Sequence, residues 1–185
     1  MKKIIRTILI LLTLVSLTGC TVGGLFYTDY NKVSVEGEEY SLTITVGELM
    51  AKGWVPANGY TTETELSFGK DCIFEKDGQL ITVTVLNPYD GSIKFGEAFV
   101  QKIVFDMAHC PNLSVRMDED ITLGFATEED VKKALGTPSN TLKTSDAVTF
   151  VYETGQNRAE FTFTENPASG TYALTSLSVE GGGNY

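Results

Sequence analysis

A short stretch with the signals of a capped helix occurs twice in this chain. The two copies are TVGELMAKGWVP, residues 45–56, and TEEDVKKALGTP, residues 127–138. Each begins with a threonine and has an acidic residue three positions later, which is the pattern of an N-terminal capping box. Each ends at a glycine with a proline soon after it, because glycine readily adopts left-handed backbone geometry and proline cannot continue a helix. We therefore predict two short helices.

Three strand-like runs follow each predicted helix. They are residues 66–75, 79–86 and 98–106 after the first helix, and residues 147–153, 159–165 and 172–180 after the second. Apolar residues alternate with polar ones in several of these runs, which is typical of strands with one buried face. Lys76-Asp77-Gly78 predicts a hairpin turn between the first two runs.

The order of these elements predicts a tandem duplication. In both copies the second strand is followed by Asn-Pro-x-x-Gly, at residues 87–91 and 166–170. We expect an α+β fold in which each repeat is a short helix plus an antiparallel sheet of three to four strands. One such unit buries little apolar surface, so the halves should pack together. The expected repeats are residues 33–106 and 107–180, and residues 181–185 are a flexible tail.

The N-terminal residues 1–19 have the composition of a secretory signal. Lys2, Lys3 and Arg6 accompany an apolar run that is too short to span about 30 Å of hydrocarbon as a permanent helix. The run ends in Leu17-Thr18-Gly19-Cys20, which resembles the lipobox of bacterial lipoproteins. The resemblance implies that Cys20 becomes the mature N-terminus and carries fatty acyl chains such as palmitate. An ordinary secretory signal with a chance cysteine is the alternative.

A lipid anchor predicts an extracytoplasmic location, on the cell membrane or on an outer membrane if one is present. Two long acyl chains hold a protein stably on a bilayer, so the globular part needs no lipid contact of its own. Residues 20–32 would then be a tether between the anchored cysteine and the first repeat.

The charge of the mature chain restricts its partners. Without the three basic residues of the signal, 11 Lys and Arg remain against 24 Asp and Glu, a formal charge of −13. Nucleic-acid binding depends on basic residues that neutralise phosphates, so we expect no nucleic-acid partner. The same charge argues against an electrostatic attachment to anionic lipid. An acidic surface that keeps the protein soluble is the simple interpretation, and a basic partner surface is the alternative.

The cysteines leave two alternatives open. Besides Cys20, the chain contains Cys72 and Cys110. Outside the cytoplasm such a pair can oxidise, so we expect either a Cys72–Cys110 disulfide or two buried free thiols. His109 is the only histidine, and the spacing of Cys and His fits no zinc motif. We predict neither a metal site nor a cofactor.

The sequence offers no evident catalytic constellation. A nucleophile needs a base within reach, and Cys110 would point away from the adjacent His109 in an extended segment. Glu128-Glu129-Asp130 is explained as the acidic first turn of a helix. We therefore expect a protein that is not an enzyme. A small hydrolase that uses carboxylates or Cys110 remains the alternative.

Residues 121–136 carry a second resemblance. An apolar strand, Gly124, Thr127 at the helix start, Val131 four residues later and Gly136 resemble a motif of small outer-membrane assembly lipoproteins of the SmpA/OmlA type. The motif also occurs, duplicated, in secreted β-lactamase inhibitor proteins. This resemblance implies helices paired with a curved antiparallel sheet, whose concave face in the duplicated form grips another protein.

These observations predict a non-enzymatic protein-binding or scaffolding module. Its expected partners are the lipid bilayer, through Cys20, and another envelope or extracellular protein. Tyr89 and Phe95 are candidate contact residues, because exposed aromatic side chains favour protein interfaces. A small-ligand or peptide receptor is the alternative, and a deep apolar pocket between the halves would favour it.

Overall fold

The computed structural model describes residues 30–42, 44–166 and 169–182. The predicted signal, residues 1–19, and the predicted lipidation site at Cys20 lie outside the described residues. In the described part, 49% of the residues are in strands and 11% are helical, so the protein is mainly β. None of the helices in this part is long and apolar enough to cross a membrane.

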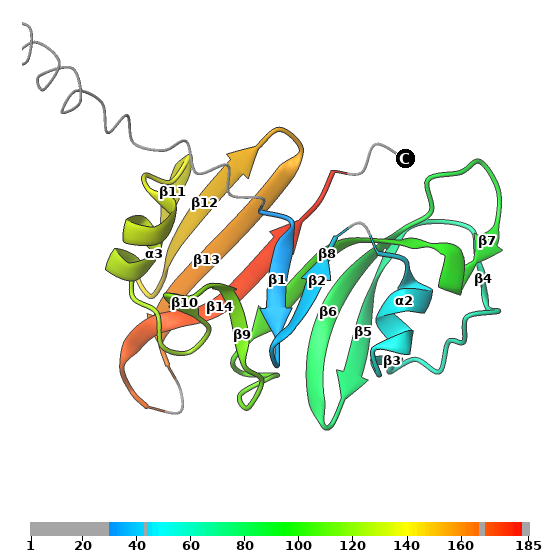
Figure 1. Ribbon diagram of the computed structural model, residues 1–185, viewed down its shortest axis with the longest axis horizontal. Helices are drawn as coiled ribbons and strands as arrows, with labels where there is room; N and C mark the ends of the chain where they lie inside the picture. Colours follow the sequence, from blue (N-terminus) through cyan, green and yellow to red (C-terminus); the bar gives the residue numbers. More distant parts are fainter. Residues whose placement is uncertain (1–29, 43, 167–168, 183–185) are drawn as a thin grey trace, which may run out of the picture.

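An antiparallel sheet of eight strands forms the main layer of the protein (Figure 1). In spatial order its strands are β11 (Asn140–Lys143), β12 (Val148–Thr154), β13 (Asn157–Glu165), β14 (Tyr172–Glu180), β8 (Phe99–Asp106), β6 (Gln79–Leu86), β5 (Lys70–Lys76) and β3 (Val55–Pro56). The lengths of β6 and β14 agree with the predicted runs 79–86 and 172–180.

The predicted α+β fold, a tandem repeat of a short helix plus a sheet of three to four strands, is wrong, because the described residues form a mainly β structure. Strands β8 and β14 pair from Ser176↔Asp106 to Glu180↔Lys102, across the boundary that we expected between two repeats. All the long strands therefore belong to one sheet. The physical reason is that an unpaired strand edge leaves backbone N–H and C=O groups without partners, and direct pairing of the two edges satisfies them.

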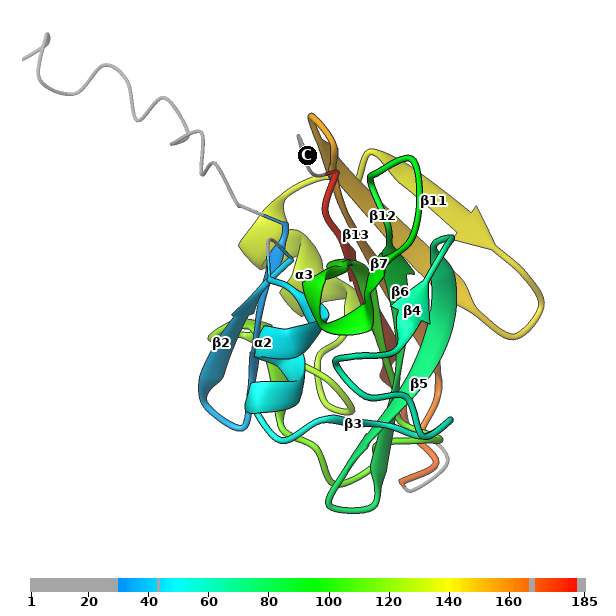
Figure 2. The ribbon, with the colours of Figure 1, turned by 90° about the vertical axis from the view of Figure 1, so that its right-hand side faces the viewer.

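A second layer covers one face of this sheet (Figure 2). It contains helix α2 (Val46–Ala51), helix α3 (Glu128–Leu135) and a smaller sheet in the order β10–β9–β1–β2. The strands of the smaller sheet are β1 (Lys32–Val35), β2 (Glu38–Ser41), β9 (Val115–Asp118) and β10 (Ile121–Thr122). Two short strands, β4 (Glu65–Leu66) and β7 (Ile93–Lys94), pair beside the 3₁₀ turn η1 (Phe95–Glu97).

Both predicted capping boxes are confirmed. The Thr45 hydroxyl accepts a hydrogen bond from the N–H of Glu48 at 3.2 Å, and the Glu48 carboxylate accepts one from the N–H of Thr45 at 2.7 Å. Thr127 and Asp130 make the same reciprocal pair, at 3.3 and 2.8 Å. Each box satisfies N–H groups that the first turn of a helix leaves unpaired.

The predicted hairpin turn between β5 and β6 is also confirmed. Asp77 and Gly78 both have positive φ, 51° and 75°, which is the geometry that a two-residue turn between twisted strands requires. The turn sets the register in which Cys72 faces Val83 and Phe74 faces Ile81. These four residues are buried, so the turn directs one face of the hairpin into the core.

The core lies between the large sheet and the second layer. Its largest fully buried side chains include Trp54, Tyr40 and Tyr152. The indole N–H of Trp54 donates a hydrogen bond to the Tyr40 hydroxyl at 3.3 Å, which joins the loop after α2 to the smaller sheet. The Tyr152 hydroxyl donates to the carbonyl O of Gly136 at 2.9 Å and holds the end of α3 on β12.

Residues at both ends of the described chain belong to this core. Tyr30, at the end of the predicted tether 20–32, is buried and its ring lies 5.8 Å from that of Tyr152. Gly181 and Gly182, which we assigned to a flexible tail, donate backbone hydrogen bonds to Gln101 and Gln156, each at 2.9 Å. The folded part is therefore longer at both ends than residues 33–180.

Candidate functional site

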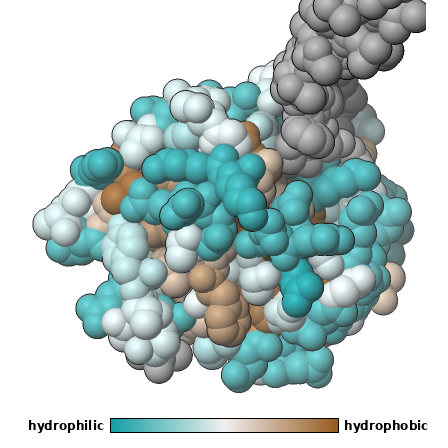
Figure 3. All heavy atoms as spheres, turned by 60° about the vertical axis from the view of Figure 1, so that its left-hand side comes forward, coloured by the Kyte–Doolittle hydropathy of each residue, from teal (hydrophilic) through white to brown (hydrophobic). Residues whose placement is uncertain are grey.

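A groove with a volume of about 830 Å³ lies between the β9–β10 hairpin and the beginning of β14. Its described lining comes from residues 107–127, from residue 166 and from residues 169–173, so it does not lie between the two predicted repeats. On the side of the molecule that carries α3, apolar side chains form a small patch surrounded by polar residues (Figure 3). The groove combines apolar residues with hydroxyl and amide side chains, a composition that suits binding of another molecule.

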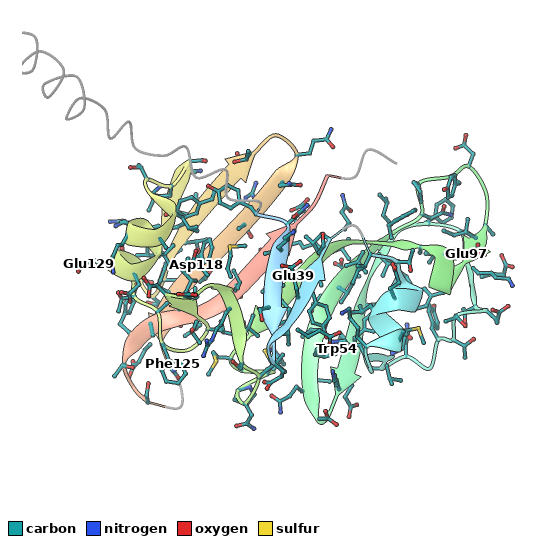
Figure 4. All side chains as sticks on the ribbon, in the orientation of Figure 1. Glu39, Trp54, Glu97, Asp118, Phe125 and Glu129 are labelled. Carbon is teal, nitrogen blue, oxygen red and sulfur yellow. The ribbon has the colours of Figure 1, made fainter. Side chains whose placement is uncertain are left out.

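Phe125 is the most exposed apolar residue of the groove. Its side chain is 81% exposed and points away from the fold at the lower edge of the second layer (Figure 4). The residue before it, Gly124, has a φ of 84°, a conformation that side chains other than glycine rarely adopt. The N–H of Gly124 donates to the Leu174 carbonyl at 2.7 Å, and the Gly124 carbonyl accepts from Nδ2 of Asn166 at 3.0 Å. The backbone that presents Phe125 is thus fixed from β14 and from the Asn-Pro loop.

Tyr172 is the second exposed aromatic side chain of the groove, at 48% exposure. It begins β14 and pairs with Glu165 of β13. Partial burial and the nearby negative charge of Glu128 raise the pKa of its hydroxyl above the ordinary value of 10. The phenol therefore stays protonated at neutral pH and is available as a hydrogen-bond donor.

Of the described residues that line the groove, Arg116 alone is charged. It lies on β9, where Ser34 of β1 and Thr122 of β10 are its neighbours on the adjacent strands. Its side chain is exposed, and no ion pair within the described part of the chain includes it. The groove therefore holds one uncompensated positive charge on a protein that is acidic overall.

The two predicted contact residues are not part of this groove. Tyr89 is 61% exposed, in the loop where its N–H donates to Oδ1 of Asn87 at 3.0 Å. Phe95 is fully buried, which makes its prediction as a partner contact wrong. Its ring packs edge-on against Tyr60 at 5.2 Å and lies nearly parallel to Phe74 at 6.2 Å. The 3₁₀ turn directs Phe95 inward, because the loop folds back over α2.

Cys72 and Cys110 are both free and buried, so the structure has the two thiols and not the disulfide. Burial raises the pKa of Cys110 to about 11. Its Sγ donates a hydrogen bond to the Asp106 carbonyl at 3.0 Å, which requires the protonated thiol. His109 is exposed, and its Nδ1 lies 4.0 Å from Asp106. A buried, protonated thiol is a poor nucleophile, because the thiolate is the reactive form.

Carboxylates gather on the uncovered face of the large sheet, but cations already pair them. Arg158 contacts Glu153 at 2.9 Å and Glu160 at 3.0 Å, and Lys102 lies 3.7 Å from Glu160. Burial raises the pKa of Glu160, but the hydrogen bond from Arg158 and the charge of Lys102 outweigh it and lower the pKa overall. A carboxyl group with a lowered pKa is a weak general acid at neutral pH. Among the described residues, no three His, Cys, Asp or Glu lie close enough to hold a metal ion.

The sequence interpretation missed Phe125, Arg116 and Tyr172 as members of one site. No local pattern in the sequence marks any of these three residues as part of a groove. Arg116 of the smaller sheet and Tyr172 of the large sheet line one groove only because the two sheets pack together, and local sequence patterns do not report this packing.

Comparisons with known proteins add little to this description. No protein-family model matches the sequence, and no curated protein matches it significantly. A similar solved structure is that of a DUF4309 family protein, YjgB, from Bacillus subtilis. The two chains are 15% identical, the match covers 76% of this chain and 82% of that chain, and the TM-score is 0.44. Such a similarity carries no conclusion about function, and the resemblance to SmpA/OmlA-like and β-lactamase-inhibitor proteins stays a prediction.

Proposed function

We propose that this protein is a non-enzymatic binding module, held outside the cytoplasm by lipid on Cys20, that contacts another envelope or extracellular protein through the groove. The observation that carries the proposal is the exposed Phe125 on an immobilised backbone. Both peptide groups of Gly124 are hydrogen-bonded to distant parts of the chain, to Leu174 and to Asn166. An aromatic side chain that projects from a rigid loop is a typical anchor residue of a protein interface.

The rigidity of this loop supports binding for a thermodynamic reason. A flexible loop loses conformational entropy when a partner immobilises it, and this loss weakens the complex. The loop before Phe125 is already ordered by its bonds to β14 and Asn166, so little entropy remains to be lost. Tyr172 places a second aromatic side chain on the same groove, and aromatic residues are enriched at interface centres.

The state of the reactive groups supports a binding role over the alternative of a hydrolase. Cys110 is buried and protonated, and Glu160 is paired with Arg158 and Lys102. Neither side chain is part of the groove lining, and the described lining residues include no histidine, cysteine or carboxylate. The described part of the groove thus offers contact surface and hydrogen-bonding groups, without an acid–base pair.

Photo-crosslinking in the native host tests the groove. A benzophenone amino acid replaces Phe125 in one variant and Leu142 in a matched control. Leu142 is 51% exposed and lies on the edge strand β11, outside the groove. We expect a discrete crosslinked species from position 125 and none from position 142. Equal labelling at both positions, or none at position 125 in a folded variant, would contradict the proposed surface.

The anchor has a separate test. Metabolic labelling with a palmitate analogue should modify the wild-type protein and not the Cys20→Ala variant, and the variant should leave the membrane fraction. An unmodified Cys20 thiol in protein from the native host, found by mass spectrometry, would refute the anchor and leave the groove unaffected.

A further inference from the structure

The electrostatics of the groove contrast with those of the rest of the protein. The chain has 24 acidic residues against 14 basic ones, yet the described residues that line the groove include Arg116 and no acidic side chain. Asp118 lies two residues further along β9, on the same face of the strand, and no ion pair among the described residues joins it to Arg116. Arg116 is therefore the position in the groove at which an anionic group is attracted.

The groups around Arg116 suit a carboxylate, which has two oxygen acceptors, better than an anion with a single charged atom. A guanidinium offers donors in a planar fork that matches the two oxygens of a carboxylate. The hydroxyl groups of Ser114, Thr122 and Thr171 also line the groove and can donate further hydrogen bonds. Charge-assisted hydrogen bonds of this kind are among the strong ones in protein recognition.

The other part of the groove is apolar. Phe125 and Tyr172 are exposed there, and Met107, Leu113, Leu123 and Ala173 contribute buried apolar side chains to the lining. A ligand that fills the groove therefore carries an apolar side chain beside its anionic group. An extended peptide provides this combination, since neighbouring residues of one segment present both kinds of side chain.

We propose that the groove recognises an extended peptide segment of the partner in which an Asp, a Glu or a terminal carboxylate adjoins an aromatic or aliphatic residue. Arg116 binds the carboxylate, and Phe125 and Tyr172 contact the apolar side chain. The proposal rests on the proposed function and specifies the chemistry of the partner. It places the specificity of the complex in Arg116 and most of the apolar contact in Phe125.

A charge reversal tests the proposal. A displayed library of random heptapeptides is selected on the immobilised full-length protein in detergent micelles, and in parallel on Arg116→Glu and on Phe125→Ala. We expect the wild-type protein to enrich peptides that carry Asp or Glu next to Phe, Tyr, Leu or Ile. Arg116→Glu should enrich Lys or Arg at the same position, and Phe125→Ala should lower the enrichment of apolar residues.

Affinity measurements on the best selected peptide make the result quantitative. Removing the charge in Arg116→Gln should weaken binding about 10-fold or more, as expected for a lost hydrogen bond to a charged group. Arg158→Gln is the matched control, because Arg158 is paired with Glu153 and Glu160 on the uncovered face of the large sheet. It should leave the affinity for the peptide unchanged. Arg116 is exposed, so its replacement should not change the thermal unfolding midpoint.

Each outcome has a definite meaning. Enrichment of the same acidic peptides by wild-type protein and Arg116→Glu would overturn the proposed carboxylate recognition. If Phe125→Ala still reduced binding in that case, the groove would remain the binding surface. If no peptide were selected and position 125 also gave no crosslink in cells, the proposed function of the groove would fail together with this inference.

Discussion

The side-chain amide of Asn166 donates a hydrogen bond to the carbonyl O of Gly124 at 3.0 Å, although the two residues are 42 positions apart. Asn166 is only 4% exposed, so water cannot readily replace the bond. It joins the Asn-Pro loop after β13 to the segment that leads into α3. This contact fixes the backbone beside Phe125 and therefore the shape of the groove.

Replacement of Asn166 by alanine should lower the free energy of unfolding by about 1–3 kcal/mol, because it leaves the Gly124 carbonyl without its partner in a buried place. Urea denaturation measures the change. Asn87→Ala is the control, since Asn87 makes related bonds to Leu66 and Gly91 in a loop that is partly exposed. A loss as large in the control as in Asn166→Ala would count against the importance of burial.

Truncation to alanine should lower the stability of the protein strongly at Phe95 and very little at Phe125. Phe95→Ala removes a fully buried ring that contacts Tyr60 and Phe74, so it should cost about 3–5 kcal/mol of stability. Phe125→Ala removes an exposed ring and should change stability by less than about 0.5 kcal/mol. Chemical denaturation of both variants measures the two changes in the free energy of unfolding. A large decrease in Phe125→Ala would argue for a structural role of that residue.

Gly47→Ala should destabilise the protein although it lies in helix α2. Helix propensity alone predicts a gain of about 1 kcal/mol for this change. A Cβ at position 47, however, would lie 2.9 Å from the carbonyl O of Gly96, a backbone atom that cannot move independently of η1. We expect a net loss of about 1–3 kcal/mol in thermal or urea unfolding. A more stable variant would show that η1 shifts easily.

The Thr127→Ala change should remove the cap of α3 and lower stability by about 0.5–2 kcal/mol. Hydrogen bonds from the backbone and side chain of Thr127 lower the pKa of Asp130. Because the pKa of Asp130 is lower in the folded than in the unfolded state, its ionisation stabilises the fold at pH values above the unfolded pKa. This stabilisation is lost as the pH falls through the folded pKa. Denaturation at pH 7 and at pH 3 should therefore show a smaller pH dependence for Thr127→Ala than for the wild type.

Cys110 should make stability fall at alkaline pH. Its pKa is raised by burial to about 11 from the ordinary 9, so the thiol of the unfolded chain ionises first as the pH rises. The contribution of the thiol is complete below about pH 9 and disappears as the pH rises through about 11. The urea midpoints measured at pH 8 and at pH 10.5 should differ less in Cys110→Ala than in the wild type. A thiol reagent that modifies native Cys110 rapidly at pH 8 would contradict the assigned burial.

Local elements were predictable because their causes are local. In both capping boxes the hydrogen-bonding partners are three residues apart, as in Thr45 and Glu48. The Asp77-Gly78 turn requires only that two adjacent residues adopt positive φ. Apolar alternation located β6 and β14 at their observed bounds for the same reason, since the period of a strand is a property of its own residues.

The fold class and the groove were decided by contacts between distant segments. Whether β8 ends its own small sheet or pairs with β14 depends on which backbone edge is nearest, and 70 to 78 residues separate the paired positions. Phe95 is inside and Phe125 is outside because of the elements that fold over them, and no local pattern distinguishes the two. Arg116 and Tyr172 line one groove because the smaller sheet packs against the large sheet. Sequence periodicity determines which face of an element is apolar, but only the closed tertiary structure determines which neighbour covers that face and which side chains remain exposed.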